Sequence, residues 1–221
     1  GLIVTGTLRG GSLRVGESLV VLPEGKPARV RTIQVHGETV SAAERGQRTA
    51  LNLVGIEREA LRRGQVLTLP GLSHLAHDVI VELSVAPDYP RIVEYWAQAR
   101  LHVGTQEVFC RIVLLMEDEL LPGDRVAAQL RTDRPIVVTR GERFVLRDES
   151  IQRTLGGGLV LDPSAVRFRR HATTTRDALE ILRQGDDVAV LTHVLHRSER
   201  PFVEKSELIP YFPRPLDALE E

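Results

Sequence analysis

The chain has 221 residues, of which 42% are hydrophobic and 27% charged, and its formal net charge is −1. These proportions are typical of a globular protein, and no stretch approaches the roughly 18 consecutive apolar residues of a membrane span, so we expect no membrane partner. The single cysteine, Cys110, excludes an internal disulfide framework. Its apolar neighbours predict a buried structural thiol. The N-terminal residues lack the basic start and cleavage site of a signal peptide, and we expect a reducing, cytoplasmic location.

Residues 1–70 predict a small β-barrel or sandwich, because short apolar runs alternate with turn signals. Within 28–35, simple alternation assigns Ala28, Val30, Thr32 and Gln34 to one face and the intervening residues to the other. A Pro-Gly pair at 70–71 marks a boundary. The expected strands are 2–4, 19–22, 28–35, 49–54 and 66–69.

Residues 75–163 repeat this style and predict a second β unit. Three consecutive glycines at 156–158 lie between apparent strands, where they permit a close backbone approach. A packing role is therefore favoured over a phosphate-binding loop, which would precede a helix. The expected strands are 78–86, 97–103, 107–116, 125–130, 136–139, 144–146 and 159–161.

Residues 164–221 change to helical spacing. Thr175 to Asp177 resembles a helix start, and Gly185 is a plausible helix end. Further helices are expected over 188–195 and from Ser206 onward. The basic run from Arg167 to His171 is interpreted either as an RNA contact or, in preference, as a solvated linker.

The sequence contains none of the common catalytic motifs. Its only Gly-Lys pair is followed by Pro27, so there is no P-loop, and no Gly-x-Ser-x-Gly elbow is present. The seven histidines are scattered and lack the companion ligands of a metal centre. We therefore expect no catalytic residue, no metal and no enzymatic activity in this polypeptide.

Several stretches carry a family resemblance. Residues 4–8, 15–17, 29–37, 43–53 and 63–67 resemble the second domain of translational GTPases of the elongation factor Tu type. Residues 101–105, 141–148 and 153–163, ending in Gly-Gly-Gly-x-Val-Leu-Asp-Pro, resemble the third domain of the selenocysteine-specific elongation factor. The implied fold is mainly β. It comprises two consecutive β-barrels (translation-factor domains II and III, residues 1–70 and 75–163) and a helical segment, 164–221, that begins a winged-helix region.

The resemblance also implies partners outside the chain. The family has an N-terminal GTPase domain that uses GTP and magnesium, and C-terminal winged-helix domains that bind a hairpin in the mRNA. Its cargo is selenocysteyl-tRNA, which it delivers to the ribosome. We expect this chain to be a fragment without the GTPase domain and without cofactor, in which the opening strand of the first barrel is missing.

In the first barrel, the resemblance places Arg48 in the pocket for selenocysteine and places Gln34, Val35 and His36 at the terminal adenosine of the tRNA. A selenol is ionised at neutral pH, and a fixed guanidinium favours an anion over the neutral hydroxyl of serine. The alternative for Arg48 is a surface ion pair with a neighbour such as Glu44. Ordinary hairpin structure is the alternative for residues 34–36.

In the second barrel, the resemblance assigns five residues to contacts with the acceptor and T stems of the tRNA, where hydroxyls and arginines hold phosphates without reading sequence. These are His102, Thr105, Arg147, Gln152 and Arg153. Two other functions remain open. One is the equivalent part of another elongation factor Tu-like GTPase with different cargo, and the other is a pair of protein-interaction barrels without an RNA role.

Overall fold

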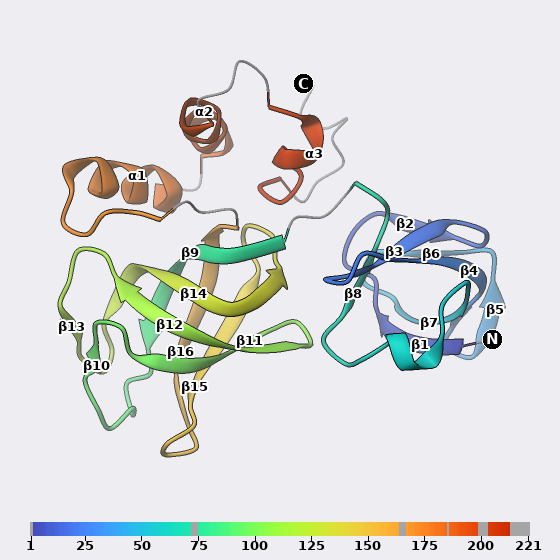
Figure 1. Cartoon of the computed structure of the whole chain (residues 1–221), viewed down its shortest axis with the longest axis horizontal. Helices are drawn as coiled ribbons and strands as arrows, with labels where there is room; N and C mark the ends of the chain where they lie inside the picture. The colour runs from blue at the N-terminus through green and yellow to red at the C-terminus, as the bar shows by residue number, and fades with distance from the viewer. Residues whose placement is uncertain (1, 72–74, 164–166, 185, 199–202, 213–221) are drawn as a thin grey trace. The chain divides into compact units, whose positions relative to one another are not determined.

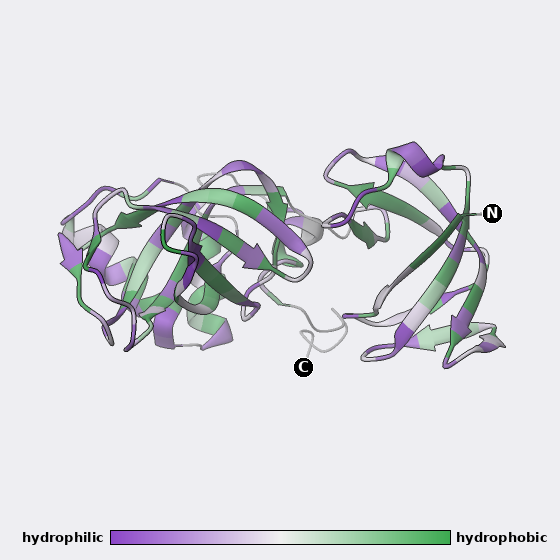
Figure 2. Ribbon diagram, turned by 90° about the horizontal axis from the view of Figure 1, so that it is seen from below, coloured by the Kyte–Doolittle hydropathy of each residue, from purple (hydrophilic) through white to green (hydrophobic). Residues whose placement is uncertain are grey.

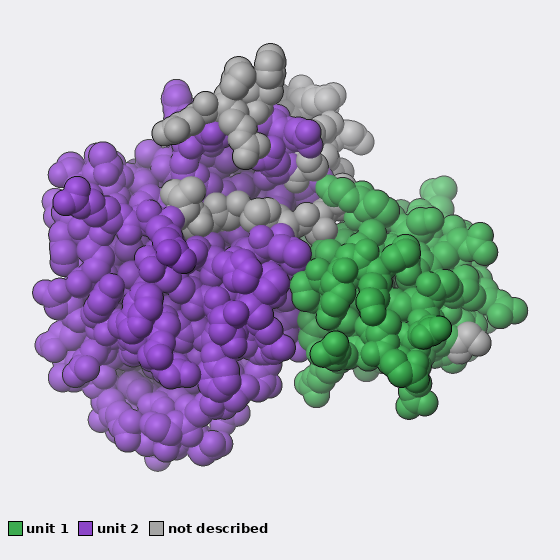
Figure 3. Space-filling model, viewed as in Figure 1, with its two compact units in different colours: residues 1–73, 213–221 green, residues 74–212 purple. Residues whose placement is uncertain are grey.

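A computed structural model describes residues 2–71, 75–163, 167–184, 186–198 and 203–212 (Figure 1). The described chain divides into two compact units, one within residues 1–73 and the other within 74–212 (Figure 3). Each unit has its own hydrophobic core. None of the described helices is both long enough and apolar enough to cross a membrane.

The first unit is built from two antiparallel sheets. The larger has the strand order β1-β7-β4-β3-β8, with β5 added to β4, and β2 pairs with β6 in the smaller. Figure 2 shows hydrophobic and hydrophilic residues in alternating bands along the strands of this unit. The bounds are β1 (Leu2–Thr7), β2 (Ser12–Arg14), β3 (Ser18–Leu22), β4 (Lys26–Val35), β5 (Glu38–Val40), β6 (Ala42–Glu44), β7 (Arg48–Val54), a 3-10 turn at Arg58–Ala60, and β8 (Val66–Thr68).

The simple alternation expected along β4 is wrong in its second half. The pairing of β4 with β7 shifts between Val30 and Thr32, which leaves Arg31 as an extra residue. An extra residue reverses which face each following side chain occupies. Ile33 and Val35 therefore join Val30 in the core, while Gln34 points outward.

The second unit contains a closed barrel of six strands in the order β11-β12-β14-β9-β16-β15. The segments expected at 125–130 and 136–139 form one long strand, β14, whose register shifts between Arg131 and Ile136. The strands are β9 (Leu75–Val85), β10 (Val93–Glu94), β11 (Gln98–Val103), β12 (Gln106–Leu114), β13 (Glu119–Leu120), β14 (Arg125–Val137), β15 (Arg143–Asp148) and β16 (Arg153–Asp162).

The three glycines of β16 serve packing, as the sequence predicts. A Cβ atom added to Gly157 would lie 2.6 Å from the carbonyl oxygen of Phe144 on β15. Cβ atoms on Gly156 and Gly158 would come even closer to carbonyl oxygens of β9. The strand can therefore lie between its two neighbours only if these positions carry no side chain.

Three helices follow the barrel: α1 (Thr173–Gln184), α2 (Asp187–Arg197) and the short α3 (Lys205–Leu208). Asp186 caps α2 by accepting hydrogen bonds from the backbone N–H groups of Val188 and Ala189. The predicted helix end at Gly185 lies outside the described residues. The apolar sides of α1 and α2 pack, together with Tyr211 and Phe212, against a patch on the outside of the barrel formed by Ile80, Val113, Leu115, Ala127 and Leu161.

A buried polar network fastens this helical segment to the barrel. Asp162, at the end of β16, is 0% exposed and accepts a hydrogen bond of 2.7 Å from the Tyr211 hydroxyl. Arg197 of α2 forms an ion pair with Asp162 and donates to the Tyr211 oxygen at 2.6 Å. A buried carboxylate needs such partners to offset its desolvation.

The basic run after the second barrel is partly engaged in the same docking. Arg170 donates from Nε to the carbonyl oxygen of Leu114 (2.8 Å) and from Nη2 to that of Glu117 (2.9 Å). It also forms an ion pair with Asp118 at 2.7 Å. These contacts give Arg170 a structural task on the barrel, which neither interpretation of the basic run, a solvated linker or an RNA contact, predicts.

Candidate nucleic-acid interface

Arg48 lies at the start of β7 on the outer face of the first unit. Its neighbour Thr49 is buried, because successive side chains of a strand alternate between faces. Arg48 itself is exposed, and its partner across the ladder is Thr7 of β1. No ion pair between Arg48 and Glu44 occurs among the described residues; the Glu44 backbone N–H instead donates to the Gln47 side chain at 2.7 Å. The guanidinium therefore faces outward.

Gln34 shares this outer face with Arg48. It is exposed and lies opposite Ala50, two residues after Arg48 on β7. His36, also exposed, begins the turn from β4 to β5, where His36 and Gly37 have φ angles of 52° and 86°. Two positive φ values in a two-residue hairpin fit a type I′ turn. The structure thus brings Gln34, His36 and Arg48 to one end of the β4–β7 pair.

Val35 is placed differently from its neighbours. Its side chain is 8% exposed and belongs to the hydrophobic core of the first unit. Little of this side chain is available to pack on a nucleobase. Val35 instead acts on its neighbours. Because successive side chains of a strand point to opposite faces, the buried Val35 directs the side chains of Gln34 and His36 outward.

In the second unit, the hairpin between β15 and β16 carries three of the predicted residues. Arg147 is exposed on β15, and Arg153 is exposed where β16 begins. Gln152 has a φ of 56°, a left-handed conformation, and its Nε2 donates to the carbonyl oxygen of Glu149 at 3.2 Å. Arg147 makes only a long contact of 3.4 Å to the Gln152 carbonyl oxygen. Both arginines are exposed, and their guanidinium groups are suited to bind phosphate.

His102 and Thr105 lie toward the opposite end of the β11–β15 pair. His102 faces Val145 of β15 and Glu107 of β12, and its Nδ1 lies 3.9 Å from a Glu107 carboxylate oxygen. Thr105 is exposed in the turn between β11 and β12. The predicted residues of the second barrel thus form a strip, defined here as Thr105, His102, Arg147, Gln152 and Arg153, that follows β11 and β15 from end to end.

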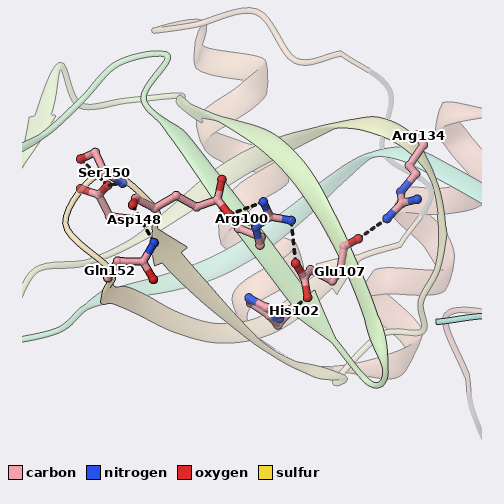
Figure 4. Close-up of polar contacts among 8 residues, drawn as sticks. Arg100, His102, Glu107, Arg134, Asp148, Ser150 and Gln152 are labelled. Atoms are coloured by element: carbon pink, nitrogen blue, oxygen red, sulfur yellow. Dashed lines mark hydrogen bonds and ion pairs between the residues drawn. The ribbon is translucent and has the colours of Figure 1, made fainter. Parts of the chain in front are cut away.

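Sequence reasoning missed Arg100, which organises the middle of this strip (Figure 4). Arg100 lies directly opposite Arg147, and like charges in such a position repel. Two carboxylates offset this repulsion, because Arg100 contacts Glu107 at 2.6 Å and also forms an ion pair with Glu149. Its outward position between buried Ala99 and Leu101 was visible in the alternation of β11.

The loop before Gln152 is held by a buried carboxylate. Asp148 accepts hydrogen bonds from the Tyr89 hydroxyl (2.8 Å) and from the Ser150 backbone N–H and hydroxyl (2.8 and 2.7 Å). Burial alone would raise the pKa of Asp148, but the hydrogen bonds from Ser150 and Tyr89 and the charge of Arg91 outweigh it and lower that pKa. Burial, followed by the bond to Asp148, raises the pKa of Tyr89 to about 12.

Comparison with protein families agrees with this architecture. Residues 1–68 match the family model described as elongation factor Tu domain 2. The fold and the first barrel therefore define a class, the translation elongation factors. Residues 77–167 match the model described as the beta-barrel domain of the selenocysteine-specific elongation factor.

Curated relatives point to the same member of this class. A selenocysteine-specific elongation factor from Desulfomicrobium baculatum is 34% identical over 172 residues, 78% of this chain and 27% of that protein. The factor of Escherichia coli K12 is 35% identical over 162 residues, 73% of this chain and 24% of its own length. The chain belongs to the selenocysteine-specific elongation factor family, as the resemblance predicts, and spans about a quarter of these two relatives.

A solved structure supports the fold. The apo form of translation elongation factor SelB from Methanococcus maripaludis aligns with a TM-score of 0.65 at 21% identity. The alignment covers 75% of this chain and 40% of the other. The predicted mainly β architecture, with two barrels followed by helices, is thereby confirmed.

Proposed function

We propose that this chain is the tRNA-binding part of a selenocysteine-specific elongation factor. The first barrel holds the aminoacyl end of selenocysteyl-tRNA, and the strip on the second barrel lies against the acceptor and T stems. The observation that carries the proposal is the exposed group of Arg48, Gln34 and His36 at one end of the β4–β7 pair. In the whole factor, a GTPase domain binds GTP and magnesium, and the factor delivers selenocysteyl-tRNA to ribosomes in the cytoplasm.

Arg48 is the residue proposed to recognise the cargo. The side chain of selenocysteine carries a negative charge at neutral pH, whereas that of serine is neutral. A guanidinium fixed on a strand stabilises the anion through charge-assisted hydrogen bonds that a hydroxyl cannot match. The burial of Thr49 beside it directs the Arg48 side chain to the outer face of the strand.

The strip on the second barrel is proposed to hold phosphates without reading base sequence. Arg147 and Arg153 are exposed, and neither has an ion pair with a described residue. Arginine on a rigid hairpin suits this task because its planar group makes paired hydrogen bonds to phosphate oxygens. The second unit is acidic overall, so binding of tRNA depends on Arg147 and Arg153 being clustered on its surface.

The salt dependence of tRNA affinity tests this assignment. The affinity of the 221-residue chain for tRNA should fall as salt rises, because each phosphate contact releases counterions. Replacing both Arg147 and Arg153 with glutamine should weaken binding and flatten the slope of log K against log salt by roughly 0.7 to 0.9 per lost contact. Arg176, exposed on α1, provides the control, since R176Q should leave the slope unchanged. An unchanged slope in the double variant would remove the strip from the interface.

A further inference from the structure

A groove of about 520 Å³ opens on the second barrel beside the strip. It lies between the outward side chains of β11 and β12, the segment that leads through β10, and the loop after β15. Aromatic side chains are concentrated in it, and the remaining lining is largely polar. The aromatic members are Tyr89, Tyr95, Trp96 and Phe109.

Trp96 is held at the groove in a strained conformation. Its φ angle is 69°, which bulky residues seldom adopt. The backbone resists relaxation, because the Trp96 N–H donates to the carbonyl oxygen of Ile112 at 2.8 Å and the Ile112 N–H donates to Ala97 at 2.9 Å. Trp96 is nevertheless 40% exposed as a residue, and the adjacent Tyr95 is 42% exposed. Backbone strain of this kind is retained where a side chain must take a particular position. In Trp96 that position leaves the side chain exposed instead of burying it.

Arginines accompany three of the four aromatic rings. The guanidinium carbon of Arg170 lies 4.1 Å from the ring centre of Tyr95, that of Arg131 5.3 Å from Trp96, and that of Arg100 4.3 Å from Phe109. Two further arginines, Arg91 and Arg111, line the groove. Each guanidinium lies over one face of its ring, and the opposite face is the kind of surface on which proteins stack unpaired nucleobases.

Two of the three carboxylates of the groove are already paired with arginines. Asp148 lies 3.5 Å from Arg91 and accepts hydrogen bonds from Tyr89 and Ser150, and Glu149 forms an ion pair with Arg100. The third, Glu94, is exposed and lies opposite Glu119 in the β10–β13 pair. Glu94 would repel a phosphate and attract a basic peptide, so its replacement distinguishes these two occupants.

The groove is continuous with the strip through Arg100. This residue lies opposite Phe109, which lines the groove, and opposite Arg147, which belongs to the strip. An RNA whose phosphates contact Arg147 and Arg153 therefore has neighbouring nucleotides within reach of the aromatic rings. Paired bases hide their faces in the helix stack, and only an unpaired nucleotide can enter.

We propose that this groove binds an unpaired nucleotide of the RNA held along the strip, with its base stacked on Trp96 or Tyr95 and its phosphates near Arg91 and Arg111. This inference rests on the proposed RNA-binding function and adds a preference for single-stranded over fully paired RNA at this position.

Trp96 is the only tryptophan of the chain, so its fluorescence reports on the groove alone. A short oligouridylate should quench this fluorescence saturably, and a blunt-ended RNA duplex should bind without comparable quenching. Binding of tRNA or oligouridylate, followed by anisotropy of a labelled RNA, with unchanged Trp96 fluorescence would overturn the groove site and leave the proposed function intact. Absence of any RNA binding would contradict both.

Variants separate stacking from folding. Trp96→Gly removes the ring and relieves the positive φ, so the backbone hydrogen bonds can persist. We expect roughly five- to hundredfold weaker binding of oligouridylate, the range of one lost stacking contact, and unchanged binding of duplex RNA. Leu121→Ala, which truncates a 51% exposed side chain outside the groove, should have no effect.

Glu94→Gln supplies a second variant that leaves the aromatic rings in place. It should strengthen oligouridylate binding by removing a nearby negative charge. Equal loss of oligouridylate and duplex affinity in Trp96→Gly would refute the site. Weakened capture of an arginine-rich peptide by Glu94→Gln, without any change for RNA, would show that the groove binds basic protein segments instead.

Discussion

At the scale of single residues, the interface is made of polar side chains whose direction is set by buried neighbours. Arg48 is exposed beside buried Thr49, and Arg147 is exposed between buried Leu146 and Asp148. A strand presents every second residue to the same face, so each buried neighbour fixes an outward one. Strands therefore position these guanidinium groups more rigidly than a mobile loop would.

Asp148 offers a test of this positioning through pH. Its pKa is lowered in the folded protein, so its carboxylate contributes stability above the unfolded value near 3.8 and loses that contribution as pH falls through the folded pKa. The variant D148N should be less stable than the wild type near neutral pH, and the difference should shrink below pH 3.8. Urea unfolding at several pH values measures this, and a constant difference down to acid pH would contradict it.

At the scale of elements, the alternating pattern predicted most strands but not their irregularities. The strands around 49–54, 97–103 and 107–116 could be predicted because their periodicity is strict. The bulge at Arg31 could not, because an extra residue is accommodated by the neighbouring strand β7 rather than by anything local to β4. For the same reason the sequence mispredicted which side chains in the second half of β4 share a face with Ala28 and Val30.

The candidate site shows the same limit. Arg48, Arg147 and Arg153 were predicted from the family resemblance, and their exposure agrees with that role without testing it. The outward direction of Arg100 could be read from the alternation of β11, but its position opposite Arg147 depends on pairing between strands distant in sequence. The aromatic groove was missed as well, because its lining comes from segments as far apart as Tyr89 and Leu155. The burial of Val35 was hidden by the same bulge that misled the prediction for β4.

The glycine triplet of β16 gives a prediction for this scale. Gly158→Ala would press a Cβ against the carbonyl oxygen of Glu82 on β9, so we expect a loss of about 1–3 kcal/mol in the free energy of unfolding. Gly10→Ala is the matched control, because a Cβ there meets nothing within 4 Å. The denaturant midpoints of the two variants measure this difference. Equal midpoints would argue against the close approach of β16 to β9.

At the scale of the whole molecule, the helical segment is part of the second compact unit rather than a separate appendage. Arg197, Asp162 and Tyr211 link α2, the barrel and the residues after α3. Through these contacts, a molecule that binds to the helices is linked to the barrel that carries the strip. The two compact units themselves each contain one half of the proposed tRNA interface.

Removing one partner of this buried network should be costly. Arg197→Met leaves the carboxylate of Asp162 buried with less compensation, and we expect a loss of about 3–5 kcal/mol in the stability of the second unit. Arg176→Met on the exposed side of α1 should change stability little. Thermal unfolding of both variants provides the measurement. A small loss in Arg197→Met would mean that the apolar contacts alone dock the helices.

The central claim concerns Arg48 as the group that recognises an anionic side chain, and one ratio tests it directly. In the full-length factor bound to GTP, the affinity for selenocysteyl-tRNA relative to seryl-tRNA should fall markedly when Arg48 is replaced with glutamine. The exposed Arg29, at the other end of the β4–β7 pair, is the control, and R29Q should retain the wild-type ratio. An R48Q factor that still prefers selenocysteyl-tRNA as strongly as the wild type would contradict the account.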